Sequence, residues 1–309
     1  MLLTREEMAF DFGGKKLDPV KDRAIIAWSV QQFLYGEMTG IQVGHWIYEA
    51  PDFDAARFLA RQAVEEFQHV GNFLRILEIL GEEPRPAHRA VRFLSTGAMP
   101  DSWPEHVALE MATGEGLVLQ AFYAMIDTID HDEITAILKR GVRQEERHVE
   151  FGEQRTMLAI QGKPWLKRRL LGQIIVTLFA VRRLESYMRR TLPMDHPVMS
   201  QLPDFVRHSV AMAELRANRM GLTDDHIESL PMSEKMRLVG EAYGGKVLES
   251  ALKKPFKLLG FLKPPRLTET YLDDPAVKRK LVPPQTDADV GMPPPPVSGT
   301  SAARPRALN

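Results

Sequence analysis

The stretch "QEERHVEFGEQ" (144–154) places Glu145 and His148 three residues apart in a segment with helical periodicity. A second copy of the same spacing, "EFQH", begins at Glu66 and ends at His69. Residues three apart on a helix share one face, so each glutamate and its histidine can reach a common ion. One Glu-x-x-His is common by chance, but two copies in one chain suggest a shared role.

A lone glutamate precedes each copy at nearly the same distance. Glu37 lies 29 residues before the first copy, and Glu115 lies 30 residues before the second. The midpoints fall in "APDF" (50–53) and "IDHD" (129–132), where proline and aspartate indicate turns between helices. Residues equidistant from the turn of an antiparallel helical hairpin lie at the same height. Each lone glutamate is therefore expected to face its own Glu-x-x-His.

The neighbours of these acids at helical spacing are mainly apolar, which predicts that the acids point inward. Buried carboxylates cost several kcal/mol each unless cations or protons neutralise them. Two divalent cations would satisfy four carboxylates and two imidazoles together. The candidate metal ligands, and thus the candidate catalytic residues, are Glu37, Glu66, His69, Glu115, Glu145 and His148. Other acids of the opening stretch, Glu146, Glu150 and Glu153, are expected to face water.

Apolar residues recur at i, i+3, i+4 and i+7 from about residue 20 to 250, and this periodicity predicts an all-α fold. Helices are expected at about 19–48, 54–80, 103–128, 132–160, 164–191, 203–220 and 232–252. The predicted organisation is an N-terminal arm (1–18), a four-helix bundle (19–160) with a long crossover between its second and third helices, additional helices (161–262) and a disordered proline-rich tail (263–309).

Composition narrows the classes of function. The chain of 309 residues has no cysteine, which excludes disulfides, thiolate metal sites and cysteine nucleophiles. Its net charge of −1 gives no reason to expect nucleic-acid binding. The longest apolar stretch, 170–181, is too short to span a bilayer, and the N-terminus lacks the pattern of a secretory signal. We therefore expect a cytoplasmic protein without a transmembrane segment. The basic segment 252–266 suggests either a terminal helix with a linker or a docking element.

With these motifs, the chain resembles the ferritin-like di-iron carboxylate proteins, in which two helices each give a Glu and two others each give Glu-x-x-His. "EERHVEFG" also looks like the fourth helix of the ligand-binding oxidases related to the ribonucleotide reductase small subunit. The resemblance covers about residues 20–160. It implies that Glu37 and His69 bind one metal, that Glu115 and His148 bind the other, and that the remaining two glutamates bridge them.

The resemblance also implies a chemistry and its partners. Such proteins use two iron ions, or manganese with iron, to activate O2 and oxidise an organic substrate. We expect an apolar or aromatic small molecule as substrate and a reductase or ferredoxin as electron donor, and the resemblance is compatible with a homodimer. Phe73 replaces the radical tyrosine of the reductase subunits, and Glu110 replaces a crosslinking tyrosine of the ligand-binding oxidases. The alternative function is a non-catalytic protein that binds or handles iron.

Further residues are candidates for supporting roles. Glu65 either pairs with Arg61 at the surface or hydrogen-bonds an imidazole, and Gln144 occupies the equivalent place in the second hairpin. His208 is a candidate extra ligand, by resemblance to arylamine N-oxygenases, although a structural role is also consistent with its position. A dry pocket near the metals, or ordinary bundle core, would be formed by Phe33, Phe73, Met111, Leu119 and Phe122.

Overall fold

The computed structural model describes residues 1–253 apart from 89–90, 93–94 and 96–99. The described residues are helical and contain no strand, which confirms the all-α prediction. The α-helices are α1 (Arg5–Met8), α2 (Arg23–Gly40), α3 (Phe53–Ile79), α5 (Trp103–Glu105), α6 (Gly116–Thr128), α7 (Asp132–Ile160), α8 (Pro164–Thr191), α9 (Leu202–Arg219) and α10 (Met232–Lys253). The proline-rich tail and the basic segment from residue 254 onward lie outside the described residues.

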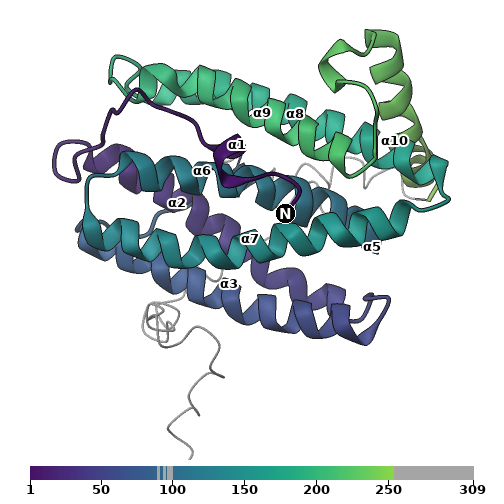
Figure 1. Cartoon of the computed structure of the whole chain (residues 1–309), viewed down its shortest axis with the longest axis horizontal. Helices are drawn as coiled ribbons and strands as arrows, with labels where there is room; N and C mark the ends of the chain where they lie inside the picture. Colours follow the sequence, from purple (N-terminus) through teal and green to yellow (C-terminus); the bar gives the residue numbers. More distant parts are fainter. Residues whose placement is uncertain (89–90, 93–94, 96–99, 254–309) are drawn as a thin grey trace, which may run out of the picture.

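Two helical hairpins form the part of the fold that matters for the site. Helix α2 packs against α3, α6 packs against α7, and α3 contacts α7 across the two pairs (Figure 1). The Asp52 side chain caps α3 by accepting a hydrogen bond from the Ala55 amide, as expected for a turn at this place. Both hairpins therefore turn where the mirrored spacing predicts.

The first helix is shorter than predicted at both ends. It begins at Arg23 rather than near Pro19, and beyond Gly40 the chain tightens into a 3-10 helix, Ile41–Ile47. Gly40 marks a close approach between helices, because a Cβ at this position would lie 2.8 Å from Glu66 Oε2. The missing side chain thus lets α2 pass directly beside a candidate ligand on α3.

The third predicted helix contains a π-helix, His106–Glu115, between α5 and α6. Its wider turns pack against α7 at Gly152, where a Cβ would lie 2.6 Å from Met111 Cβ and 2.7 Å from the Ala112 amide nitrogen. π-helical segments are rare and often occur at functional sites. Here the segment ends at Glu115, so it sets how that carboxylate meets the other helices.

Gly152→Ala is expected to destabilise the protein by at least about 3 kcal/mol, at the upper end of the usual cost of overpacking, because backbone atoms of the π-helix block the added methyl group. The measurement is the free energy of unfolding from urea denaturation. Gly240→Ala is the matched control, since nothing lies within 4 Å of its added Cβ and alanine favours a helix. Equal stabilities of the two variants would contradict this account of the packing.

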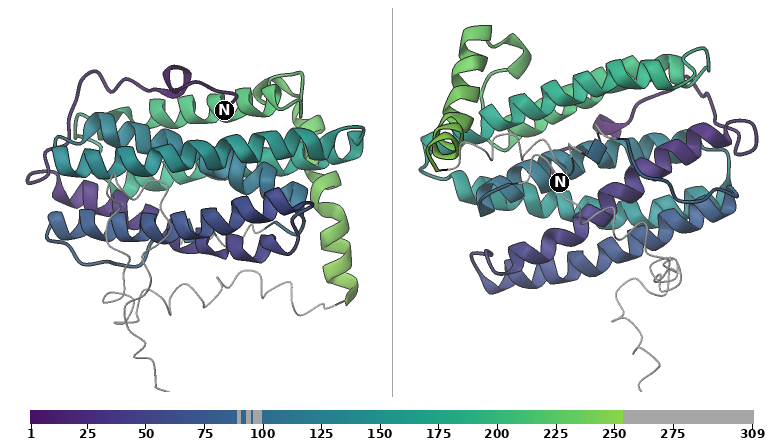
Figure 2. Two further views of the ribbon diagram at one scale, coloured as in Figure 1. Left: turned by 60° about the horizontal axis from the view of Figure 1, so that its bottom comes forward. Right: turned by 180° about the vertical axis from the view of Figure 1, so that it is seen from behind.

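Helices α8 and α9 lie together on the side of α6 and α7 that faces away from α3, and α10 packs on α8 at one end (Figure 2). The N-terminal arm runs along this layer and buries Leu3, Met8 and Phe12. None of the helices in the described part of the chain has the length and apolar character needed to cross a bilayer.

Contacts with this layer correct one expectation about the acids of α7. The Glu150 side chain is 48% exposed, whereas Glu146 is half-buried and accepts a hydrogen bond from the Tyr123 hydroxyl, and Glu153 is 1% exposed rather than facing water. Its carboxylate pairs with the fully buried Arg216 of α9 (Nε–Oε1 2.9 Å) and accepts a hydrogen bond from the Leu2 amide (2.7 Å). Glu153 is therefore an anchor for α9 and the N-terminal arm.

Candidate metal centre

The structure brings the six candidate ligands together between the two hairpins. Glu37 comes from α2, Glu115 from the end of the π-helix, and one Glu-x-x-His from each of α3 and α7. Five of the six are buried, and Glu115 is half-buried as a residue although its Oε2 atom is enclosed. The mirrored spacing in the sequence thus corresponds to one cluster in space.

One group of potential ligand atoms surrounds His69 Nδ1. Glu37 Oε2 lies 3.1 Å from this nitrogen, Glu145 Oε1 lies 2.9 Å from it, and Glu66 Oε2 lies 3.7 Å from it. The ligand atoms of these four residues lie within 4.8 Å of one another. They can therefore reach a single ion.

A second group surrounds His148 Nδ1 and shares the central glutamates. Glu66, Glu115 and His148 offer ligand atoms within 4.8 Å of one another. Glu66 Oε1 lies 3.6 Å and Glu145 Oε2 lies 3.7 Å from His148 Nδ1. Each central carboxylate thus turns one oxygen toward each imidazole, and the two rings are 6.1 Å apart between centroids. This geometry suits two neighbouring ions with shared carboxylates.

The Nε2 atom of each imidazole contacts a side chain of the other hairpin. His148 Nε2, on α7, lies 2.8 Å from Glu65 Oε2 on α3, whereas His69 Nε2, on α3, lies 2.8 Å from Gln144 Oε1 on α7. Arg61 and Arg147 also bind Glu65, so Glu65 combines both of the roles that its sequence context suggested. Such outer partners fix the orientation of a metal-binding ring. They leave both Nδ1 atoms facing the carboxylates.

The chemistry of the cluster fits divalent metal ions. Glu115 Oε2 and His148 Nδ1 are buried without a hydrogen-bond partner. Buried polar atoms normally have partners, and those without one call for an explanation. Two divalent cations would neutralise four carboxylates, and a mixed set of carboxylate and imidazole ligands is one that divalent metals accept.

The local electrostatics show the cost of the cluster in the absence of cations. Burial, reinforced by the other carboxylates, raises the pKa of Glu37 and of Glu115 well above the ordinary value. Burial alone would lower the pKa of His69 and His148, but the facing carboxylates outweigh it and raise both pKa values. Burial would also raise the pKa of Glu65, yet His148 and the two arginines lower it to about 2. Glu37, Glu115 and both imidazoles therefore retain protons, while Glu65 stays ionised, as does Glu145, whose pKa the two imidazoles lower despite its burial.

These shifts predict how the stability of the metal-free protein depends on pH. Raised pKa values mean that the folded state binds protons more tightly than the unfolded chain, whose carboxyl and imidazole groups titrate near 4.5 and 6.5. The free energy of unfolding should therefore fall as pH rises above the ordinary imidazole value of 6.5. The measurement is thermal unfolding of metal-free protein across this range.

Saturation with a divalent metal should reverse that trend, because the metal displaces the same protons and binds more tightly at high pH. Calorimetry in two buffers with different ionisation enthalpies would count the protons released on binding. A metal affinity independent of pH would contradict the assignment of protonated groups to the cluster.

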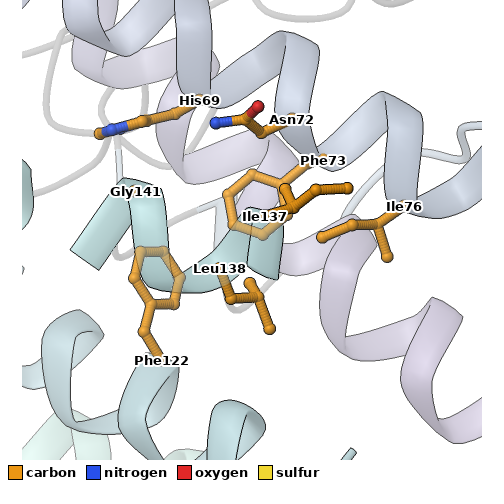
Figure 3. Close-up of a pocket in the computed structure, with 8 residues that line it drawn as sticks. All are labelled: His69, Asn72, Phe73, Ile76, Phe122, Ile137, Leu138 and Gly141. Carbon is orange, nitrogen blue, oxygen red and sulfur yellow. The ribbon is translucent and has the colours of Figure 1, made fainter. Parts of the chain in front are cut away.

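Aromatic residues cover the His69 side of the centre. Phe33 stacks on Phe73 at 5.9 Å and meets Phe122 edge-on at 4.9 Å. Phe73 and Phe122 line a small cavity, as Figure 3 shows. Met111 and Leu119 are fully buried but are not among the residues that line it. Only part of the predicted pocket therefore surrounds a space.

Two further residues change the list of candidates. His208 Nε2 lies 3.2 Å from the carbonyl oxygen of Met8, so this side chain is engaged with the N-terminal arm and belongs to neither ligand group. Sequence reasoning missed Gln62, whose amide nitrogen lies 2.9 Å from Glu115 Oε1 and 3.3 Å from Glu66 Oε1. Its position one helical turn before Glu66 was the signal that could have identified it.

Comparison with known proteins assigns no family. No family model matches the chain, and neither a curated protein nor a solved structure matches it. The cluster itself, four carboxylates and two imidazoles that can hold metal ions, is therefore the feature from which a function can be inferred.

Proposed function

We propose that this protein is a di-iron oxidase or oxygenase with a ferritin-like arrangement of α2, α3, α6 and α7. The observation that carries the proposal is the position of Glu66 and Glu145, each with one oxygen toward either imidazole. A site for a single ion has no need of two carboxylates shared in this way. The long connection between α3 and α5 would be the crossover of the bundle.

The ligands divide naturally between two ions. Glu37 and His69 would hold one ion, Glu115 and His148 would hold the other, and Glu66 and Glu145 would bridge them. Two iron ions, or one manganese with one iron, would supply the electrons that reduce O2 and the oxidising power that acts on an organic substrate.

The remaining residues orient the ligands and exclude water. Glu65 and Gln144 hold the two rings with Nδ1 toward the carboxylates. Gln62 donates to Glu115 and Glu66 and so limits how far these side chains can rotate. Phe33, Phe73 and Phe122 keep the His69 side dry, which would protect reactive oxygen species from side reactions.

The size of the cavity supports the second candidate, a non-catalytic iron-binding protein. The space beside His69 measures only about 10 Å³, whereas pockets for organic ligands are usually about 300 Å³ or more. An oxidase would have to open this region, or another one, to admit an organic substrate. An iron-handling protein would not.

Oxygen uptake would distinguish the two functions. The protein is loaded anaerobically with two Fe(II) per chain, and O2 consumption is followed with and without a panel of arylamines, aldehydes and fatty acids plus a reductant. Repeated turnover that requires one of these compounds and yields its oxidised product supports the oxidase. O2 consumption that does not depend on these compounds, together with mineral iron in excess of two ions per chain, supports iron handling. Glu115→Ala is the inactive reference for the oxidase reaction.

A further inference from the structure

A small space lies beside the imidazole of His69, among buried side chains. It measures about 10 Å³, which corresponds to room for one water-sized molecule. Its lining consists of His69, Asn72, Phe73, Ile76, Phe122, Ile137, Leu138 and Gly141 (Figure 3). Most of these side chains are hydrocarbon, and the imidazole of His69 forms the wall toward the candidate metal centre.

The absence of a side chain at Gly141 leaves space next to the imidazole of His69. A Cβ added at Gly141 would lie 3.8 Å from His69 Cδ2, at ordinary contact distance, so the absent side chain leaves the ring edge uncovered. The mirrored position in the other hairpin is Gln62, since each residue lies four before the central glutamate of its helix. Gln62 fills its position and bonds to Glu115 and Glu66. A side chain therefore fills this position on α3, whereas a glycine leaves the equivalent position on α7 empty.

Polarity argues against water as the occupant. A buried water usually needs two to four polar partners. The polar groups in the lining are those of His69 and Asn72, and both nitrogens of His69 are engaged elsewhere, with Gln144 and with the carboxylates. The cavity therefore offers at most one polar residue as partner. Its volume also excludes any organic molecule of several heavy atoms.

We propose that this cavity is a docking place for dioxygen, one imidazole ring away from the position of the ion held by Glu37 and His69. A diatomic apolar molecule suits the hydrocarbon lining, and among apolar ligands it is close in size to the one water-sized molecule for which there is room. O2 would then approach the centre from the His69 side, because Gln62 occupies the mirrored place near Glu115. The chemistry that follows docking rests on the proposed function, but occupancy of the cavity by O2 does not.

Dissolved O2 is paramagnetic, so its occupancy can be measured without any reaction. The full-length protein is loaded with redox-inert Zn(II), its Ile and Leu methyl groups are labelled, and methyl relaxation is recorded under increasing O2 pressure. The methyl groups of Ile76, Ile137 and Leu138 should show enhancements several-fold larger than those of Leu59 and Leu170, which are equally buried outside the cavity.

Two variants make the result specific to the cavity. Gly141→Leu should reduce the enhancement at Ile137 to the level of Leu59, and Gly141→Ala should reduce it partly, since its methyl group makes only ordinary contacts. Gly240→Leu, on the exposed side of α10, should leave the enhancement unchanged. Equal enhancement at all buried methyl groups, or a local enhancement that survives Gly141→Leu, overturns the proposal.

A second readout tests whether the docking place lies on the route to the metals. In stopped-flow mixing of O2 with the di-Fe(II) protein, Gly141→Leu should slow iron oxidation at least tenfold while keeping two irons per chain. An unchanged rate would show that O2 arrives by another route and would overturn that part of the proposal. Failure of the unsubstituted protein to bind two irons would instead contradict the proposed function. The methyl measurement, repeated on metal-free protein, would still decide the occupancy of the cavity.

Discussion

Glu66→Ala is expected to release both metal ions from the protein rather than one. Glu66 belongs to both ligand groups, and its two oxygens face different imidazoles. Loss of an outer partner of a metal ligand typically costs 10–100-fold in affinity, so loss of a shared carboxylate should exceed about 100-fold at each position. Metal analysis after gel filtration should fall from two ions per chain to almost none.

Three comparisons sharpen this expectation. Glu145→Ala should behave like Glu66→Ala, whereas Glu37→Ala should weaken mainly the ion beside His69. Glu78→Ala removes a carboxylate from the exposed side of α3 (side chain 70% exposed) and should retain both ions. Retention of two ions per chain by both Glu66→Ala and Glu145→Ala would show that the ligand assignment is wrong. Circular dichroism of the metal-free variants checks that the fold is intact.

Arg216→Ala is expected to cost about 3–5 kcal/mol of unfolding free energy, which is the usual penalty for leaving one partner of a buried ion pair uncompensated. Arg216 is fully buried, and its guanidinium is so close to Gly116 that a Cβ there would overlap it. Its removal leaves the Glu153 carboxylate buried and without its cation, although the Leu2 amide still donates a hydrogen bond to it. Urea denaturation, with the slope checked for two-state behaviour, measures the loss.

A surface pair and a double variant serve as controls for Arg216→Ala. Arg219 pairs with Glu7 at about one-third exposure on both side chains, so Arg219→Ala should cost no more than about 1 kcal/mol. The double variant Arg216→Leu with Glu153→Leu should recover much of the stability, because it leaves no unpaired buried charge. Similar losses in Arg216→Ala and Arg219→Ala would contradict a structural role for the buried pair.

The ligand cluster was predictable because its signal is local and repeated. The spacing of Glu37 from "EFQH" matches that of Glu115 from "EERH", and both depend only on helical periodicity and on the place of a turn. Hairpin geometry converts such spacing directly into proximity. The apolar neighbours at helical spacing also indicated correctly that these acids point inward.

Other features could not be predicted, because they depend on partners distant in sequence or on a backbone geometry that no residue pattern indicates. Glu153 resembles its exposed neighbours in sequence, and only the position of Arg216, 63 residues later, makes it a buried anchor. The π-helix at His106–Glu115 has no composition that distinguishes it from an α-helix. Met111 shares helical spacing with Glu115, yet it packs with Val43, Trp46 and Leu59 rather than around the cavity. Tertiary packing decides each of these cases.

Each imidazole is hydrogen-bonded by a side chain of the other hairpin, and this affects the order of folding. The contact between His69 and Gln144 spans 75 residues, and that between His148 and Glu65 spans 83. Contacts of such sequence separation form only after the entropy cost of closing long loops has been met. An isolated first hairpin would carry three ligands, but the Nε2 atom of its histidine ring would lack its partner Gln144. Metal capture in its final geometry is thus a late event, which must follow the docking of one hairpin on the other.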